Sequence, residues 1–507
     1  MNTNIYNVFT EHFPADLSST FIETEDGQTW SYADLDQESA RLARFLTDNG
    51  VQKGERVAVQ VEKTPQALFL YLACLRAGFI YLPLNTAYTE SELAYFIDNA
   101  EPAVVVCRAS SLSSFKQIAK GKSVRHFYTL DDAPEHNLLP LSESTSPQFD
   151  TTPCNEDDVA VILYTSGTTG RPKGAMITHG NLAANGLALK QIWGFTRNDV
   201  LLHALPIFHI HGLFVACHCV LLSGSKMLFI PKFNADTLIE LLPRATVLMG
   251  VPTFYTRLLD NPAFTSAVCS NMRLFISGSA PLLEQTFTEF QQRSGHTILE
   301  RYGMTETGMN TSNPLQGERK AGTVGHPLPG VTTRIVDDEG NPVARNSVGN
   351  LQVKGDNVFK GYWGMPDKTA EEFTSDGFFK TGDMATLDDD DYISIVGRGK
   401  DMVITGGFNV YPKEIELLID EFDGVIESAV IGVPHPDFGE AVTAVATRDA
   451  SNRACTEENI IASLKPKLAN YKIPKRILFV DALPRNTMGK VQKNLLRETY
   501  ADLFSHK

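Results

Sequence analysis

The sequence predicts an α/β protein in which a large amino-terminal domain, made of α/β sheet subdomains and a small β-subdomain, precedes a small α+β domain. Short β-branched runs alternate with amphipathic segments of helical length, which is the pattern of βαβ units and a largely parallel sheet. The length of 507 residues exceeds one ordinary hydrophobic core. After Gly397 a charged turn, a short strand, a glycine loop and a proline-started helix follow one another. We therefore expect one domain over residues 1–399 and another over 400–507.

The first part of the chain predicts helices and strands in alternation. Ser31 is a suitable N-cap and Gly50 a suitable end for the first helix, and Thr64 and Pro65 open the second. The expected elements are a helix over 31–49, a strand over 56–61, a helix over 64–78, an extended segment over 81–83, a helix from residue 89 and a strand over 103–107.

The middle of the chain contains a connection and further short strands. Residues 134–158 are rich in Ser, Thr, Pro and acidic residues, which is typical of a surface connection. The apolar run 159–165 has the length of a buried strand. Also expected are a strand over 174–178, a strand running into a small-residue turn over 275–282, and short strands with Gly and Pro turns from about 324 to 353.

The composition excludes some classes of partner. The formal charge of -15 and the pI near 5.3 argue against nucleic acid, because binding phosphodiester backbones calls for a basic face. Seven cysteines without a regular framework favour a reducing compartment. We find no leader-like pattern and no uninterrupted apolar run of about 18 residues, so we expect a cytoplasmic protein without a membrane partner. The sequence leaves the oligomeric state open.

A group of histidines and cysteines between His203 and Cys219 raises the alternative of a zinc site. Zinc ligands normally come in pairs at defined spacing. The run 213–224 instead has the character of a buried apolar segment in which cysteine acts as a small hydrophobe. We therefore favour a structural interpretation of this group.

The stretch LYTSGTTGRPKGAMIT, residues 163–178, has the composition of a loop that wraps a phosphate. Its glycines allow backbone N–H groups to turn inward. Side chains expected to donate hydrogen bonds or charge are those of Thr165, Ser166, Thr168, Thr169 and Lys173. The alternative is a plain Gly/Ser/Thr hairpin. The stretch is not a Walker A loop, because Pro172 stands in place of the second glycine and Ala175 follows Gly174.

This loop resembles the signature of the adenylate-forming superfamily, which contains acyl-CoA synthetases, peptide-synthetase adenylation domains and luciferases. Further segments resemble that superfamily in the same order along nearly the whole chain. They are PIFHIHG (206–212), SGSAPL (277–282), ERYGMTET (300–307), FKTGDMA (379–385), GRGKDMVITGGFNVYP (397–412) and PRNTMGKVQK (484–493). The resemblance implies a ligase with ATP and coenzyme A as co-substrates and Mg²⁺ as cofactor.

The resemblance also implies roles for individual residues. Those implied to bind ATP or AMP are Thr165, Ser166, Gly167, Thr168, Thr169, Gly170, Lys173, Gly278, Ser279, Ala280, Tyr302, Asp383 and Arg398. Those implied to be catalytic are Lys490, Glu306, Thr305 and His209, with Glu306 and Thr165 at the metal. The residue types suit these tasks, because an aromatic face stacks on a flat base and a carboxylate oxygen binds Mg²⁺.

By the same resemblance the carboxyl-terminal domain is mobile, with its hinge at Lys400. The domain would rotate between two half-reactions. In the first a carboxylate attacks the α-phosphorus of ATP and forms an acyl-adenylate and pyrophosphate, and in the second a thiolate displaces AMP. Rotation would withdraw Lys490 and present Gly406, Gly407 and Phe408 to the pantetheine arm. A lysine next to a glycine is otherwise an ordinary solvated charge.

Arg301 suggests which acid is activated. A guanidinium beside the acyl pocket suits a second carboxylate on the substrate, which it can pair bidentately. The segments ILERYGMTETGMNTSNP and PIFHIHGLFVA resemble malonyl-CoA synthetases, which implies malonate, and methylmalonate as well. The residues implied to hold the acid are Arg301, Ser277, His209 and Met304. The alternative is that Arg301 pairs structurally with Glu300 or Glu306.

Some questions of specificity stay open at this point. Gly308 stands where the family has a more polar residue, which leaves the pocket size and the tolerance of an α-methyl group undecided. One alternative function is a CoA ligase for another short or aromatic carboxylate. Another is an adenylation enzyme that loads a separate carrier protein.

Overall fold

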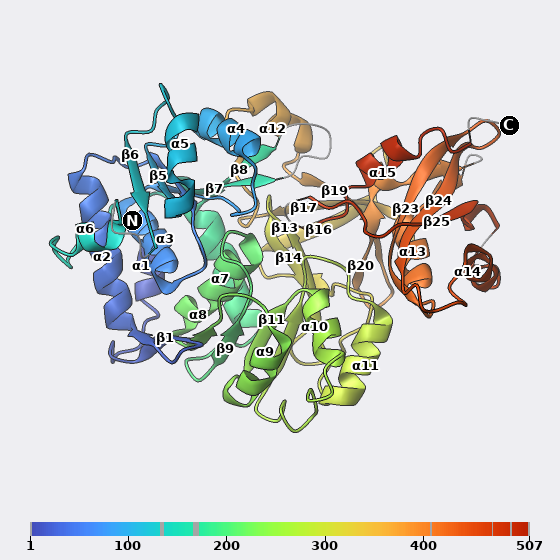
Figure 1. The fold of residues 1–507 in the computed structure, drawn as a ribbon, viewed down its shortest axis with the longest axis horizontal. Coiled ribbons are helices and arrows are strands. Elements are labelled where there is room, and N and C mark those ends of the chain that lie inside the picture. Colours follow the sequence, from blue (N-terminus) through green and yellow to red (C-terminus); the bar gives the residue numbers. More distant parts are fainter. Residues whose placement is uncertain are drawn as a thin grey trace. The chain divides into compact units, whose positions relative to one another are not determined.

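The structure is a computed structural model that describes residues 3–131, 136–165, 172–405, 408–468, 470–486 and 489–504. The chain divides into two compact units, one of residues Met1–Thr333 and Val353–Phe379 and one of residues Arg334–Gln352 and Lys380–Lys507. Figure 1 shows their elements, and each unit has its own hydrophobic core. The predicted boundary at Lys400 remains a prediction.

The first unit contains a sheet with the strand order β18-β8-β7-β4-β3-β5-β6. Strands β7, β4, β3, β5 and β6 pair in parallel, and β8 and β18 are antiparallel additions. The bounds are β3 Arg56–Gln60, β4 Ile80–Pro83, β5 Val104–Cys107, β6 His126–Thr129, β7 Val159–Thr165, β8 Lys173–Thr178 and β18 Gly361–Tyr362. This parallel core confirms the predicted βαβ units.

The second sheet of this unit has the strand order β15-β14-β13-β12-β11-β9-β10-β1-β2. Its strands from β13 to β1 pair in parallel. The bounds are β1 Thr20–Thr24, β2 Thr29–Ser31, β9 Val200–His203, β10 Lys226–Phe229, β11 Val247–Gly250, β12 Leu274–Ser277, β13 Leu299–Met304, β14 Gly308–Ser312 and β15 His326–Pro327.

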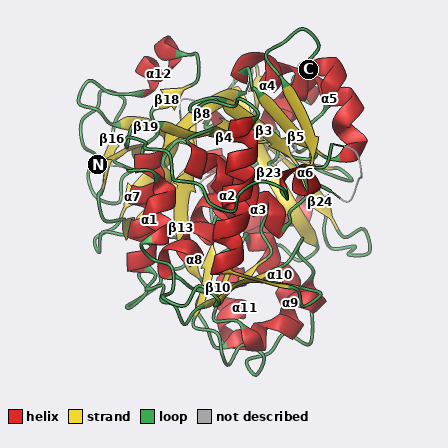
Figure 2. Cartoon of the chain, turned by 90° about the vertical axis from the view of Figure 1, so that its left-hand side faces the viewer, coloured by secondary structure: helices red, strands yellow, loops and turns green. Residues whose placement is uncertain are grey.

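Helices pack on both sheets, and the predicted caps are confirmed. The side chains of Ser31, Thr64 and Thr89 accept hydrogen bonds at the starts of three helices. The α-helices are α1 Ile5–Thr10, α2 Tyr32–Asp48, α3 Pro65–Ala77, α4 Glu90–Ala100, α5 Leu112–Ile118, α6 Leu138–Ser142, α7 His179–Ile192, α8 His218–Ser223, α9 Ala235–Leu241, α10 Pro252–Leu259, α11 Glu284–Ser294 and α12 Pro366–Glu372. Helices α2 and α3 lie side by side (Figure 2), and α3 is buried on nearly every face.

Shorter helical turns complete the unit. They are the 3₁₀ turns Ala109–Ser111 and Leu242–Arg244 and the π-helix His211–Cys217. The predicted surface connection over residues 134–158 differs in that it contains helix α6. There the Asn137 side chain caps the helix and Leu138 is fully buried, so local capping and burial outweigh the polar composition.

The second unit contains most of a four-stranded sheet with the strand order β16-β17-β19-β20. It also contains a five-stranded sheet with the order β22-β21-β24-β23, in which β25 pairs with β24. The strand bounds are β16 Val331–Val336, β17 Gly349–Gly355, β19 Phe379–Leu387, β20 Ile393–Arg398, β21 Val403–Thr405, β22 Phe408–Val410, β23 Val425–His435, β24 Gly439–Arg448 and β25 Arg476–Phe479. The helices are α13 Pro412–Asp420, α14 Glu457–Leu464 and α15 Lys493–Thr499, with 3₁₀ turns at Gly399–Asp401 and Asn470–Lys472.

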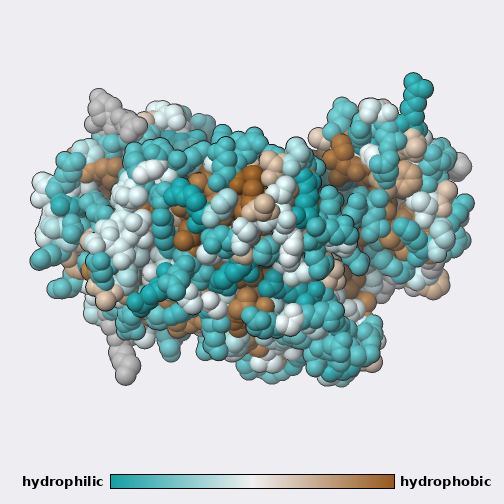
Figure 3. All heavy atoms as spheres, turned by 90° about the horizontal axis from the view of Figure 1, so that it is seen from below, coloured by the Kyte–Doolittle hydropathy of each residue, from teal (hydrophilic) through white to brown (hydrophobic). Residues whose placement is uncertain are grey.

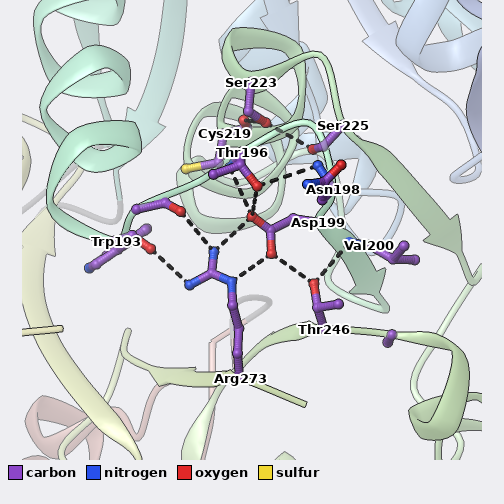
Figure 4. Close-up of polar contacts among 12 residues, drawn as sticks. Trp193, Thr196, Asn198, Asp199, Val200, Cys219, Ser223, Ser225, Thr246 and Arg273 are labelled. Carbon is purple, nitrogen blue, oxygen red and sulfur yellow. Dashed lines mark hydrogen bonds and ion pairs between the residues drawn. The ribbon is translucent and has the colours of Figure 1, made fainter. Parts of the chain in front are cut away.

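An ion pair between a buried carboxylate and a half-buried guanidinium holds the amino ends of neighbouring strands in the larger sheet (Figure 4). Arg273, just before β12, donates to both carboxylate oxygens of Asp199, just before β9, at 2.6 and 2.9 Å. Thr246, just before β11, donates to the same carboxylate at 2.8 Å. Arg273 also donates to the carbonyl oxygen of Trp193 at the end of α7. One carboxylate and one guanidinium therefore tie three strands and a helix together.

The surface is largely hydrophilic, as expected for a chain in which 21% of the residues are charged. On the face drawn in Figure 3, hydrophilic residues predominate and apolar residues gather in small patches. Among the described helices, none combines the length and the apolar character needed to cross a membrane.

We expect Asp199→Asn to destabilise the first unit by about 1.5–3 kcal/mol, because the buried carboxylate that accepts charge-assisted hydrogen bonds from Arg273 is lost. Tryptophan fluorescence during urea denaturation measures this, since every tryptophan of the chain belongs to the first unit. These residues are Trp30, Trp193 and Trp363. Burial alone would raise the pKa of Asp199, but the hydrogen bonds from Arg273 and from the backbone of Thr196 hold that pKa below its ordinary value.

The pH dependence follows from this lowered pKa. A carboxyl group of this kind contributes stability above its unfolded-state pKa, about 3.9, and loses it as the pH falls through its folded-state pKa. The difference between wild type and variant should therefore be full at neutral pH and shrink below about pH 4. The matched control is Asp98→Asn, whose pair with Lys122 is exposed and should contribute less than about 1 kcal/mol. Equal losses in the two variants would contradict the assignment.

Candidate active site

The predicted segments converge at one edge of the larger sheet. Strand β12 ends at Ser277, β13 carries Arg301 and ends at Met304, and β9 ends at His203, just before residues 206–212. These strands are joined in parallel through β11, so their carboxyl ends meet at the same edge. Ligands of open α/β sheets bind at this edge.

Arg301 is a deeply buried cation, with 3% of its surface exposed. Its guanidinium lies against the backbone of Gly278, where an added Cβ would come within 2.4 Å of Cζ. Only glycine at this position leaves the space. Burial lowers the pKa of Arg301 to about 10, and the neighbouring Tyr255 hydroxyl and Glu300 carboxylate oppose this shift. The group is therefore still a cation at neutral pH.

Four buried polar atoms on three residues at this edge lack hydrogen-bond partners among the described residues. They are Nε and Nη2 of Arg301, Oγ of Ser277 and Nε2 of His211. No ion pair joins Arg301 to Glu300 or Glu306 in the part of the chain that the structure describes. Unpartnered buried donors are costly, and a buried unpaired cation more so. The arrangement suits a polar, anionic group of a ligand.

His211 is a member of this group that the sequence did not single out. It begins the π-helix, is buried, and its Nδ1 lies 3.2 Å from Oγ of Ser279. Burial and then the positive charge of Arg301 hold the pKa of His211 well below its ordinary value, so the ring is neutral at pH 7. Ser279 itself has a left-handed φ of +70°, which a non-glycine residue seldom adopts.

His209, which the sequence favours, is half-buried with its ring 4.5 Å from that of Phe208. Its role remains a prediction. The spacing of two histidines in HIH does not determine which ring points toward the β12 turn, so no sequence signal distinguished them.

The phosphate side of the site joins segments far apart in the sequence. Nζ of Lys173 lies 4.2 Å above the ring of Tyr362 and 3.4 Å from Glu372. The hydroxyl of Tyr362 donates to Oε1 of Glu306 at 3.1 Å. Tyr362 thus links the lysine of the loop to the carboxylate implied at the metal, and no motif pointed to it. Thr165 donates to the backbone of Lys173. The predicted loop residues Ser166, Gly167, Thr168, Thr169 and Gly170 lie outside the described residues.

Glu306 is suited to a metal. Its carboxylate is buried, and Tyr362 is its hydrogen-bond partner among the described residues. Mg²⁺ in nucleotide sites is commonly held by one or two carboxylates together with phosphate oxygens, so a cluster of protein ligands is not required.

The remaining predicted residues of this unit border the same edge. Tyr302 and Met304 are half-buried and approach each other at 3.9 Å, and Ala280 is exposed. Thr305 lines a cavity of about 20 Å³ together with Gly308. Gly308 has a φ of +59°, and an added Cβ would lie 2.7 Å from the Asn185 side chain. A larger residue at position 308 would therefore displace Asn185 and alter this small space.

A second cavity, of about 360 Å³, opens where strands of the two sheets end. Its lining is mostly apolar and includes Tyr81, Leu84, Phe208 and Phe254, with Lys63 at its wall. No sequence pattern pointed to this space.

The second unit holds the other predicted residues. Asp383 on β19 and Arg398 on β20 face each other in register, with 2.8 Å between Arg398 Nε and Asp383 Oδ1. Lys400 is exposed in the turn that follows. Phe408 is exposed and stacks on Tyr471, and Gly406 and Gly407 lie outside the described residues. Lys490 is also exposed. The implied roles of these residues remain predictions.

Known proteins resemble the chain over nearly its full length. The AMP-binding enzyme family matches residues 10–363, and the AMP-binding enzyme C-terminal domain matches residues 414–490. A malonate–CoA ligase from Arabidopsis thaliana is 36% identical over 94% of this chain and 85% of the relative. A feruloyl-CoA synthase from an Amycolatopsis species is 34% identical over 94% of each.

The crystal structure of ATP-bound MatB from Rhodopseudomonas palustris superimposes with a TM-score of 0.96 at 53% identity, over 99% of this chain and all of that one. The predicted α/β fold with a small carboxyl-terminal domain is confirmed by these matches. The predicted resemblance to adenylate-forming enzymes and to malonate–CoA ligases is confirmed as well. This chain belongs to the AMP-binding enzyme family.

Proposed function

We propose that this chain ligates malonate, and also methylmalonate, to coenzyme A in an ATP-dependent, AMP-forming reaction. The observation that carries the proposal is the buried Arg301 guanidinium, whose Nε and Nη2 lack partners among the described residues. The malonate–CoA ligase from Arabidopsis thaliana, which is similar over 94% of this chain, supports the same acid.

The unpaired cation favours a dicarboxylate over a monocarboxylate. One carboxylate of malonate must face the α-phosphorus to react, and the other is then available to pair with Arg301. A monocarboxylate would leave Arg301 buried and unpaired in the complex, which is strongly unfavourable. Oγ of Ser277 and the neutral ring of His211 can donate further hydrogen bonds to the distal carboxylate.

The main alternative is an aromatic acid, as the feruloyl-CoA synthase relative illustrates. An aromatic ring needs an apolar wall, whereas the groups gathered here are a guanidinium, a hydroxyl and an imidazole. The second alternative, transfer to a separate carrier protein, differs only in the thiol and is separated by the experiment below.

The proposed mechanism assigns the residues as follows. The substrate carboxylate is already ionised, so the step needs charge neutralisation at the phosphate more than a base. Lys173 and Lys490 would supply positive charge there, Tyr302 would cover the adenine, and Asp383 would hold the ribose hydroxyls. In the second half-reaction the CoA thiolate displaces AMP after a rotation about Lys400.

Mg²⁺ belongs to the same proposal. The buried Glu306 carboxylate, with Thr165 on the loop strand, fits the oxygen ligands that this cation prefers. When bound, Mg²⁺ neutralises charge on the phosphate oxygens. We also propose the cytoplasmic location that the sequence predicts, which the seven free, buried thiols support.

We expect pyrophosphate release to be faster with malonate than with acetate, octanoate or cinnamate, and product formation to require CoA. The physical reason is the unpaired Arg301 cation. If all three monocarboxylates outperform malonate, the assignment of the acid is wrong. Pyrophosphate release that continues while CoA yields no thioester would favour a carrier protein as the acceptor.

Arg301→Leu should lower kcat/KM for malonate, because a buried charge pair with the substrate is lost. The decrease should correspond to a loss of about 2–5 kcal/mol in transition-state stabilisation. The ratio of malonate to propionate activity should fall by a similar factor. Lys173→Ala is the control, since a phosphate-side lysine should lower the rate with every acid equally. An equal loss across all acids in Arg301→Leu would mean that Arg301 does not select the substrate.

His211→Ala should lower kcat/KM for malonate by about 1–3 kcal/mol, because a buried hydrogen-bonding group at the distal carboxylate is removed. His209→Ala is the matched comparison two residues away and should cost less. If His209→Ala lowers kcat/KM for malonate more than His211→Ala does, His209, which the sequence favours, is the residue that binds the distal carboxylate.

A further inference from the structure

Two ion pairs bracket the segment that carries Lys490. Arg485, before it, pairs with Glu427 on β23. Lys493, after it, pairs with Glu416 on α13, with 2.5 Å between Nζ and Oε1. Both pairs lie within the second unit.

The described residues on the two sides of positions 487–488 pair with each other. Arg485 and Val491 form an antiparallel bridge, and the backbone N–H of Gln492 donates to the carbonyl oxygen of Pro484 at 2.8 Å. Lys490 lies directly beside this bridge and is itself exposed. Its backbone N–H donates to the side chain of Asn486 at 3.0 Å. The position of Lys490 therefore depends on where these paired residues are anchored.

Glu416 is a rigid anchor. Its side chain is 7% exposed, and the same Oε1 that meets Lys493 accepts the backbone N–H of Val430 at 2.8 Å. The carboxylate is thus fixed to strand β23 as well as to its own helix. A lysine paired with a buried carboxylate is held firmly, because either charge alone would be costly in this environment. Lys493 lies three positions after Lys490, at most about 10 Å of extended chain, so displacement of one shifts the other.

The same helix carries a matched pair that does not involve this segment. Glu414 pairs with Lys472 at 2.7 Å and lies two residues before Glu416. It offers the same chemistry on the same helix without a contact to residues 484–493 among the described ones.

We propose that Glu416 is a positioning residue for Lys490 and acts through Lys493. The inference rests on the proposed function, in which Lys490 serves adenylate formation and is withdrawn for thioester formation. A residue that only stabilises the fold would affect both half-reactions alike. A residue that positions Lys490 should affect the first and spare the second.

The test compares Glu416→Gln and Glu414→Gln. Glutamine at position 416 still accepts the Val430 N–H but no longer pairs with the Lys493 charge. We expect Glu416→Gln to slow malonate-dependent pyrophosphate exchange by about tenfold to a hundredfold, because a small misplacement of a catalytic group has effects of this size. Thioester formation from supplied acyl-adenylate and CoA should stay within about twofold, and Glu414→Gln should change neither rate.

Variants of the partner make the test independent of the folding of Glu416→Gln. Lys493→Met should reproduce the selective loss, and Lys493→Arg should restore exchange because it keeps the charge. Equal slowing of both half-reactions, or no slowing of exchange, would overturn the inference. Lys490→Ala separates this failure from that of the proposed function. If Lys490→Ala leaves pyrophosphate exchange intact, or abolishes both exchange and thioester formation, the proposed role of Lys490 is wrong. If Lys490→Ala abolishes exchange alone, the role of Lys490 stands, and the Glu416 and Lys493 variants then test the positioning role of Glu416.

Discussion

The ion pair of Asp199 and Arg273 is the constraint on which the larger sheet depends. It fixes the amino ends of β9, β11 and β12, and the carboxyl ends of β9 and β12 then lead into the segments that build the site. Because parallel strands begin at one edge and end at the other, register set at the first edge determines which side chains meet at the second. The stabilising ion pair and the residues of the candidate site therefore lie at opposite ends of the strands of one sheet.

Two arginines in this unit differ in how their charges are satisfied. Arg273 is satisfied by the Asp199 carboxylate and by backbone carbonyl oxygens. Arg301 is more deeply buried, yet its Nε and Nη2 have no partner among the described residues. The folded chain bears the cost of desolvating this cation, which a carboxylate-bearing substrate would offset. This cost is the basis of the selectivity for a dicarboxylate that we propose.

The amino group of Lys63 contacts the segment that leads to His211. Nζ of Lys63 donates to the carbonyl oxygens of His203 and Ile230 and meets Nδ1 of His203 at 2.8 Å. Nε2 of His203 lies 2.8 Å from the carbonyl oxygen of Gly212, so the ring proton belongs on Nε2 and Nδ1 accepts from Lys63. This chain of contacts, which starts beyond β3 of the other sheet, fixes the beginning of the π-helix next to His211.

The sequence by itself determined what depends on neighbouring residues. Caps such as Ser31 and Thr64 fix helix starts through bonds three residues away. The ordered motifs identified the superfamily, placed Glu306 after a strand and made Arg301 a candidate for binding the acid. Only the tertiary structure decided that Nε and Nη2 of Arg301 lack partners among the described residues, that His211 meets Ser279, and that Tyr362 reaches Glu306. These contacts join segments more than fifty residues apart, and their geometry is set by strand register and core packing, which no local pattern encodes.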